Sequence, residues 1–79
     1  MGDLITLTQY KVLDAIGIGD YVSNISKKAD VTYSHTVKLL NRWLLEEFIK
    51  QAYKGRIRFI KLTPKGKLLL KNAKRLLEG

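Results

Sequence analysis

The sequence predicts a mostly helical α+β fold with a three-helix core, a two-stranded β-hairpin and a C-terminal helix. Three observations favour it. Apolar residues recur at helical spacing as far as residue 46 or 47. Over residues 48–62 the apolar period changes to two around a Lys54-Gly55 turn, which is typical of a hairpin. Thr63-Pro64 then places an N-cap residue before a proline at the first helical position, which predicts the start of a last helix.

We expect residues 1–79 to form one domain, because the chain is close to the smallest size that a single core supports and has no linker or repeat. Within it, the hairpin takes up about residues 49–62 and the final helix about residues 64–78. The chain has no cysteine, and its one histidine, His35, has no carboxylates clustered near it in the sequence. We therefore expect no disulfide, no metal and no other cofactor.

Membrane association and catalysis are not expected either. No apolar run approaches the roughly 20 residues that span a bilayer, and the N-terminus lacks the basic and apolar segments of a signal peptide. The sequence therefore favours a cytoplasmic protein. It has no paired carboxylates, no nucleophile beside a base and no Gly-rich phosphate loop, so we do not expect an enzyme.

The first 31 residues predict a short edge strand over Leu4–Leu7 and two helices. Thr8 is expected to cap the first helix, which stops at Gly17, and Asp20 to cap the second, which runs to about Ala29. Residues 17–19 form a tight connector and residues 30–31 a short turn. The side chains expected to face the core are Val12, Leu13 and Ile16 of the first helix and Val22, Ile25 and Ala29 of the second.

Thr32 is predicted to cap a third helix from Tyr33 to Glu46 or Glu47. At about 100° per residue, one side is apolar and is expected to face the core. That side consists of Tyr33, Val37, Leu40 and Leu44, with Thr36 and Trp43 on one shoulder of the solvent face, Trp43 at the core boundary, and Leu39 and Leu45 exposed. The opposite side carries small polar groups near its N-terminus and cations further along, which suits the base edges and phosphates of a major groove. The DNA contacts predicted from this helix are Thr32, Ser34, His35, Lys38 and Arg42.

The charge of the chain is strongly uneven. Residues 1–26 hold one base and three acids, a net charge of −2, whereas residues 27–79 hold 14 bases and four acids, a net charge of +10. This imbalance indicates a polyanionic partner, either nucleic acid or an anionic membrane surface. Lys54, Arg56 and Arg58 lie around the predicted hairpin turn, where they would enter a minor groove or bind phosphates. A helix-turn-helix followed directly by such a hairpin is the order of a winged helix-turn-helix.

Four segments carry a resemblance to a known family: Val31–Val37, Leu44–Ile49, Gly55–Arg56 and Leu62–Gly66. Together they resemble MarR-type winged-helix transcription regulators, among the small archaeal or viral kinds, over roughly residues 7–70. The resemblance implies that Thr32–Arg42 is the recognition helix and Lys54–Arg58 the wing. It also implies a homodimer that binds a pseudo-palindromic DNA site.

Two features differ from that family. Phe48 stands where these proteins usually carry a glycine at the end of the recognition helix. We therefore expect this helix to end without a left-handed residue or to continue further. The sequence also has almost nothing before Leu4 and only one helix after the hairpin, whereas MarR proteins have long terminal helices that frame a dimer interface and an effector pocket. We therefore expect no small-molecule effector.

The final helix has a wide apolar arc, with Leu69, Ala73 and Leu76 in one line and Leu70 and Leu77 beside it. This arc predicts a homodimer through the C-terminal helix. The alternative is that every leucine packs within its own chain.

The function predicted from all of these features is that of a sequence-specific regulator that binds double-stranded DNA. Two alternatives use the same fold. One is a non-specific architectural or replication-associated DNA-binding protein, for which the basic segment alone would suffice. The other is a winged helix that binds protein or RNA.

Overall fold

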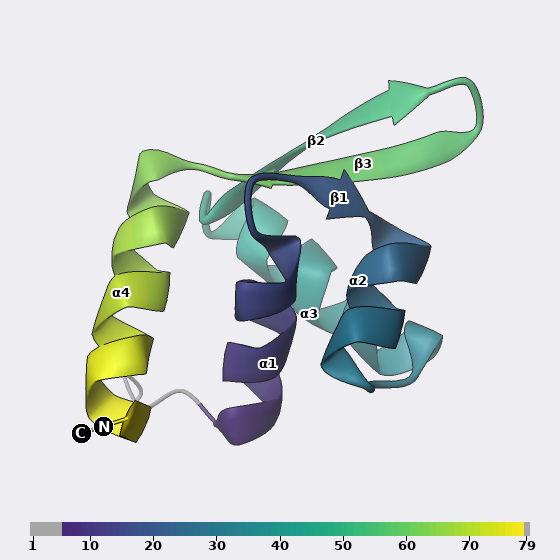
Figure 1. Cartoon of the computed structure of the whole chain (residues 1–79). Coiled ribbons are helices and arrows are strands. Elements are labelled where there is room, and N and C mark those ends of the chain that lie inside the picture. The colour runs from purple at the N-terminus through teal and green to yellow at the C-terminus, as the bar shows by residue number, and fades with distance from the viewer. Residues whose placement is uncertain (1–5, 79) are drawn as a thin grey trace.

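The computed structural model describes residues 6–78, which form four helices and a three-stranded antiparallel sheet. The helices α1 (Leu7–Ile16), α2 (Val22–Ala29) and α3 (Tyr33–Leu45) pack together, and α4 (Pro64–Glu78) lies beside α1 (Figure 1). The strands are β1 (Asp20–Tyr21), β2 (Ile49–Lys54) and β3 (Ile57–Leu62), in the spatial order β1-β3-β2. The sheet crosses one end of the helices, and the β2–β3 hairpin extends past α2 (Figure 1).

The core lies between the three N-terminal helices and the inner face of the sheet. The predicted inward residues of α1 and α2 are confirmed, since all six are buried. The side chains with no exposed surface include Leu13, Ile16, Ile25, Leu40 and Ile60. Residues opposite each other across two strands share one face of a sheet, so the Ile49–Leu62 and Gln51–Ile60 pairs identify the face that covers the helices. None of the helices among residues 6–78 is long and apolar enough to cross a membrane.

The start of α1 differs from the prediction. Thr6, not Thr8, is the N-cap: its hydroxyl accepts a hydrogen bond from Gln9 N (3.1 Å), and Gln9 Oε1 accepts one from Thr6 N (3.2 Å). This reciprocal capping box satisfies two amide groups that a cap at Thr8 would leave without partners. Thr6 and Leu7 therefore begin the helix rather than forming part of an edge strand, and the other two residues of that predicted strand, Leu4 and Ile5, lie outside the described residues.

Asp20 also has a different role from the predicted helix cap. It belongs to β1, a strand that the sequence did not predict, and Tyr21 takes the N-cap position of α2 without a side-chain bond. The Asp20 carboxylate accepts from Tyr21 N and Asn24 Nδ2 and lies 2.7 Å from Lys28 Nζ. The bond from Lys28, supported by those from Asn24 and Tyr21, outweighs partial burial and lowers the pKa of Asp20.

The recognition-helix candidate α3 is turned relative to the prediction. Its buried residues are Thr36, Leu39, Leu40 and Trp43, while Tyr33 is exposed and Val37 and Leu44 are half-buried. The buried side of α3 is thus rotated about the helix axis, relative to the predicted one, by a little less than the angle of about 100° between successive residues. Trp43, the bulkiest apolar side chain of the helix, packs inside the core. Thr36 accompanies it because its hydroxyl donates to Thr32 O (2.9 Å), so its burial leaves no hydrogen-bonding group without a partner.

Candidate nucleic-acid interface

The N-terminal end of α3 is capped by its own sequence, as predicted. Thr32 Oγ1 accepts from His35 N at 3.2 Å, while the turn before it is closed by Asp30 in a left-handed conformation (φ 57°). Ser34 and His35 are exposed in the first turn of the helix. The remaining first-turn amides of a helix attract anions such as phosphate. This end of α3 therefore presents short polar groups and a positive dipole end to solvent.

The two predicted cations of α3 remain exposed despite the turn of the helix. Lys38 and Arg42 both lie outside the buried stripe of Thr36, Leu39, Leu40 and Trp43. The sequence reading missed that Arg42 pairs with Glu46, with Nε and Oε1 3.6 Å apart and both side chains largely exposed. A surface pair of this kind contributes about 0–1 kcal/mol, so a phosphate group can displace the carboxylate. The pair holds the guanidinium along the exposed side of α3.

Arg58 connects the hairpin to α3. Its Nη2 donates to Asn41 Oδ1 at 3.0 Å, and its Nε donates to Gln51 Oε1 on the neighbouring strand. Asn41 and Gln51 were not among the predicted site residues, because neither sequence position signals a contact 17 or 7 residues away. A guanidinium has five N–H donors, so Arg58 still has donors for a phosphate or a base while it holds the two elements together. Arg58 thus lies at the base of the interface rather than at its tip.

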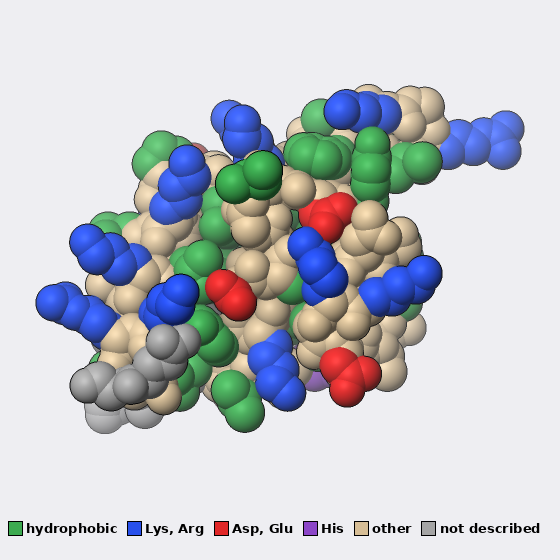
Figure 2. All heavy atoms as spheres, in the orientation of Figure 1, with side chains coloured by type: hydrophobic (Ala, Val, Ile, Leu, Met, Phe, Trp, Pro, Cys, Tyr) green, Lys and Arg blue, Asp and Glu red, His purple; other side chains and the backbone are tan. Residues whose placement is uncertain are grey.

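The hairpin tip is shifted by one residue from the prediction. Lys54 pairs with Ile57, so the turn consists of Gly55 and Arg56, and Gly55 takes a left-handed conformation (φ 65°) that favours glycine. Lys54 Nζ lies 5.0 Å from the centre of the Phe59 ring. Arg56 is exposed in the turn itself, and Figure 2 shows basic side chains at the outer end of the hairpin. The tip therefore places Arg56 at the outer end of the hairpin, while the Lys54 ammonium lies back over the Phe59 ring.

A hollow of about 230 Å³ separates the hairpin from the helices. Its lining residues are Tyr21, Val22, Ser23, Tyr33, Arg56, Ile57 and Arg58. Tyr33, which the prediction placed in the core, is more than half exposed at this hollow. The sequence analysis did not take into account that Tyr33 is the first residue of α3. A first helical residue extends beyond the neighbouring helices that bury the following turns. Tyr33 is thereby an additional candidate for contact with a ligand held between α3 and the hairpin.

The C-terminal end of α3 is held by a segment far along the chain, which we call the clasp (residues 63–66). Thr63 Oγ1 donates to Glu47 O at 2.7 Å, Thr63 N donates to Phe48 O at 3.1 Å, and Lys65 Nζ donates to Glu46 O at 2.9 Å. The same ammonium lies 4.6 Å from the centre of the Phe48 ring. These bonds satisfy the carbonyl groups of the three residues that follow the last helical residue, Leu45.

The turn inside the clasp corrects the expectation for the end of α3. The helix ends at Leu45, and Glu47 takes a left-handed conformation (φ 65°) although it is not glycine. Phe48 N then donates back to Trp43 O at 2.9 Å, as in other helix ends that use a left-handed residue. Glycine is required instead at Gly66, where an added Cβ would lie 1.9 Å from Phe48 O. The first turn of α4 and the end of α3 are therefore in direct backbone contact.

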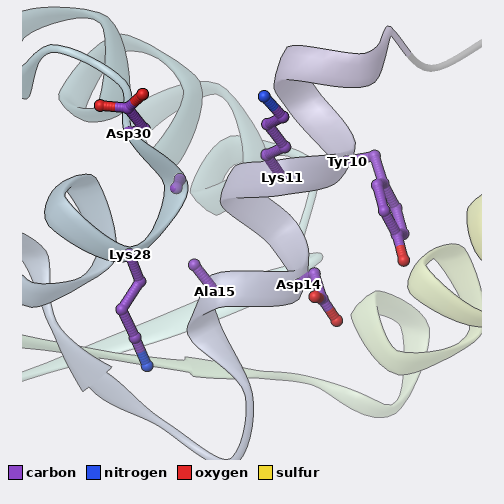
Figure 3. A pocket seen from close by; sticks show the side chains of 7 residues that line it. Tyr10, Lys11, Asp14, Ala15, Lys28 and Asp30 are labelled. Atoms are coloured by element: carbon purple, nitrogen blue, oxygen red, sulfur yellow. The ribbon is translucent and has the colours of Figure 1, made fainter.

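A second hollow, of about 390 Å³, lies between α1 and α2, away from the exposed side of α3. Lys11, Asp14, Lys28 and Asp30 contribute charged side chains to it, but these point in different directions (Figure 3). Groups that bind a small ligand together have to converge on it. The charged side chains of this hollow do not converge, so the polar and basic side of α3 is the stronger candidate for a binding site.

No protein-family model matches the sequence, and no curated protein is similar to it at a significant level. Solved structures do match. BpsR of Bordetella bronchiseptica, whose DNA binding is regulated by 6-hydroxynicotinic acid, has a TM-score of 0.85 at 18% identity over 95% of this chain and 61% of that chain. The DNA-binding protein Sso10a-2 of Sulfolobus solfataricus has a TM-score of 0.85 at 15% identity, over 91% of this chain and 76% of that chain. Wild-type MarR of E. coli has a TM-score of 0.81 at 22% identity, over 91% of this chain and 57% of that chain.

These superpositions cover nearly the whole chain, including α2, α3 and the hairpin. The chain has a winged-helix fold. In this fold α2 and α3 are the helix-turn-helix pair, the β2–β3 hairpin is the wing, and β1 adds a third strand at its base. The predicted fold class is thus confirmed, and the resemblance to MarR-type proteins is confirmed for the fold. The chain spans less than two thirds of the BpsR and MarR chains.

Proposed function

We propose that this winged helix is a sequence-specific regulator that binds double-stranded DNA, with α3 in the major groove and the wing on the minor groove or the phosphates. The observation that carries the proposal is the link between Asn41 and Arg58, which joins the exposed side of α3 to the basic wing. Neither element contains an acidic residue. DNA-binding proteins and regulators among the similar structures support the same function.

The residues divide into two roles. Ser34 and His35, near the N-terminus of α3, approach base edges with short donors and acceptors, and the amides and hydroxyl of the Thr32 cap lie beside a phosphate. Lys38 and Arg42 bind phosphates or guanine further along the groove. In the wing, Lys54 and Arg56 reach the minor groove or its phosphates, and Arg58 keeps the wing at a fixed position relative to α3.

We further propose that the protein acts as a homodimer through α4. Leu69 and Ala73, two members of the predicted leucine line, pack within the chain, but Leu68, Leu76 and Leu77 keep 58%, 64% and 42% of their surface exposed. Exposed leucines on a helix at the edge of a small protein favour pairing with a second copy. A dimer would bind two half-sites, which is the arrangement that a pseudo-palindromic site requires.

Selection of bound sequences from random duplex DNA tests the proposal. A defined motif that binds at least about a thousandfold more tightly than random duplex supports a sequence-specific regulator. The spacing of two half-sites in the motif measures the dimer geometry.

Equal competition by random duplex would contradict specific reading. It would favour the non-specific DNA-binding protein instead, a second candidate that the basic residues outside α3 and the wing support. The absence of any duplex binding at low salt would reject both candidates.

A further inference from the structure

A second group of cations lies on α4, on the side turned away from the core. Ala73 is buried and Leu69 and Leu70 are half-buried, so they mark the inner side of the helix. At about 100° per residue, the basic residues between and beyond them point outward. We call these four exposed side chains the α4 basic face: Lys67, Lys71, Lys74 and Arg75. Figure 2 shows basic side chains gathered over this helix.

The α4 basic face is electrostatically unfavourable in the isolated chain. Lys71 has Lys67 four residues before it and Arg75 four residues after it, and like charges at this spacing repel on a helix surface. Residues 49–77 contain no aspartate or glutamate. Within the described part of the chain, the ion pairs are Lys28–Asp20 and Arg42–Glu46, and both lie on other elements. Among the described side chains none forms an ion pair with this face, and Glu78, four residues after Lys74 in the sequence, is the one acid of α4, at its C-terminal end.

We infer that the α4 basic face binds a second segment of duplex DNA, separate from the one proposed for α3 and the wing. Lys67 and Arg75 are about 12 Å apart along the helix axis, and a duplex carries about seven negative charges over that length. Figure 1 shows α4 and the wing tip at opposite ends of the molecule, so the two surfaces do not form one continuous site.

The form of the face favours a duplex over other anionic partners. A peripheral membrane helix inserts a continuous apolar side beside its cations. On α4 the apolar side is divided: Ala73 is buried and Leu69 and Leu70 are half-buried against the rest of the chain, while the exposed leucines are the ones proposed to pair with a second copy. A protein partner would bury an apolar centre, and the arc that holds Lys67, Lys71 and Lys74 has no apolar member. A row of cations without such a centre matches the uniform phosphate charge of a duplex.

The test counts bound duplexes per chain. The probe is a random-sequence duplex of one helical turn, about 10 base pairs, at low salt, and the complex is measured by sedimentation equilibrium. We expect two duplexes per wild-type chain. The Lys67→Gln/Lys71→Gln/Arg75→Gln variant is expected to bind one, with the affinity of the remaining site unchanged within about twofold. Because the ratio is counted per chain, two separate sites on each chain give the same value in a monomer and in a dimer.

Matched single substitutions separate a local contact from an effect of net charge. Lys71→Gln is expected to weaken the second site about fivefold. Lys11→Gln removes the same charge from an exposed position on α1 and is expected to leave the site unchanged. Equal weakening by both variants, or a wild-type ratio of one duplex per chain, would overturn the inference. The inference would also be overturned if the wild-type chain binds one duplex and binds phosphatidylserine vesicles, and the triple variant loses the vesicle binding.

The same measurement separates this inference from the proposed function. Lys38→Ala/Arg42→Ala is expected to remove the α3 site and leave the α4 site. If the wild-type chain binds one duplex and the α3 variant binds none, only the α4 site is rejected. If the wild-type chain binds one duplex, the α3 variant still binds it and the α4 variant does not, the α3 interface is rejected and the α4 site is retained.

Discussion

The two ends of α3 are built in different ways. At the N-terminal end, Thr32 caps the helix from within four residues of sequence, and the side chains that follow point to solvent. At the C-terminal end, carbonyl groups of residues 46–48 are bound by the clasp, which lies 15 or more residues further along. The comparison indicates that the clasp fixes where the helix points, while the N-terminal half stays exposed for the proposed contact with DNA.

The largest effect is expected from a substitution that breaks the clasp. In Gly66→Ala the new Cβ would lie 1.9 Å from Phe48 O, so the first turn of α4 or the end of α3 has to move. We expect a loss of about 3 kcal/mol in the free energy of unfolding, measured by denaturant titration. Gly55→Ala is the control: its position has a left-handed φ but no atom within 4 Å, so a loss of about 1 kcal/mol is expected. Equal losses in the two variants would contradict the clasp.

The two threonine caps allow a direct comparison of the ends. Thr63 accepts from Gly66 N and donates to Glu47 O, whereas Thr32 accepts from His35 N alone through its side chain. We expect Thr63→Ala to lower the free energy of unfolding by about 2 kcal/mol and Thr32→Ala by about 1 kcal/mol. Thermal or urea unfolding gives both values. If Thr32→Ala were the more damaging, the N-terminal end would be the better fixed of the two.

Lys65 provides a milder perturbation of the clasp. Lys65→Met removes the hydrogen bond to Glu46 O and the contact with the Phe48 ring but keeps the length of the side chain. A loss of about 1 kcal/mol is expected, because a lysine near a helix C-terminus also stabilises the helix dipole. Lys67→Met is the matched control, with a change near zero. Fluorescence of Trp43, whose carbonyl bonds Phe48 N, reports whether the end of α3 has moved.

The smallest effect concerns Asp20, which lies outside both ends of α3. Its pKa is lowered, chiefly by the bond from Lys28, so its contribution to stability is complete above the ordinary carboxyl pKa near 4. That contribution is lost as the pH falls through the lower pKa of the folded state. Asp20→Asn is therefore expected to reduce stability at neutral pH and to match the wild type in acid. A difference that persists unchanged at low pH would show that the charge of Asp20 is not responsible.

The contrast between the two ends of α3 also explains what the sequence could predict. The caps at Thr32 and Thr63 depend on neighbours three or four residues away, so both were predicted correctly. The left-handed Glu47 and the link from Arg58 to Asn41 depend on contacts between distant segments, which no local pattern encodes. The orientation of α3 was predicted wrongly because Thr36 looks polar in sequence, yet its hydroxyl is satisfied by the preceding turn and packs inside.

Of the predicted DNA contacts, all eight lie on α3, its cap or the wing, and seven of them are exposed. Arg58 is the half-buried exception, because it holds the wing against Asn41. The sequence therefore predicted the elements on which these eight residues lie and the exposure of most of them. It did not predict the side chains that connect them, since Gln51 and Asn41 resemble ordinary surface residues until the wing is placed against the helix.

Chemical-shift mapping of the backbone amides during titration with duplex DNA directly locates the proposed contact surface on α3 and the wing. We expect the largest changes in residues 32–42 and 54–58, with Ser34, Lys38 and Arg56 among them, and small changes in residues 46–48, which the clasp holds. Changes confined to α1 and α2, or none in residues 32–42 at saturating DNA, would contradict the account.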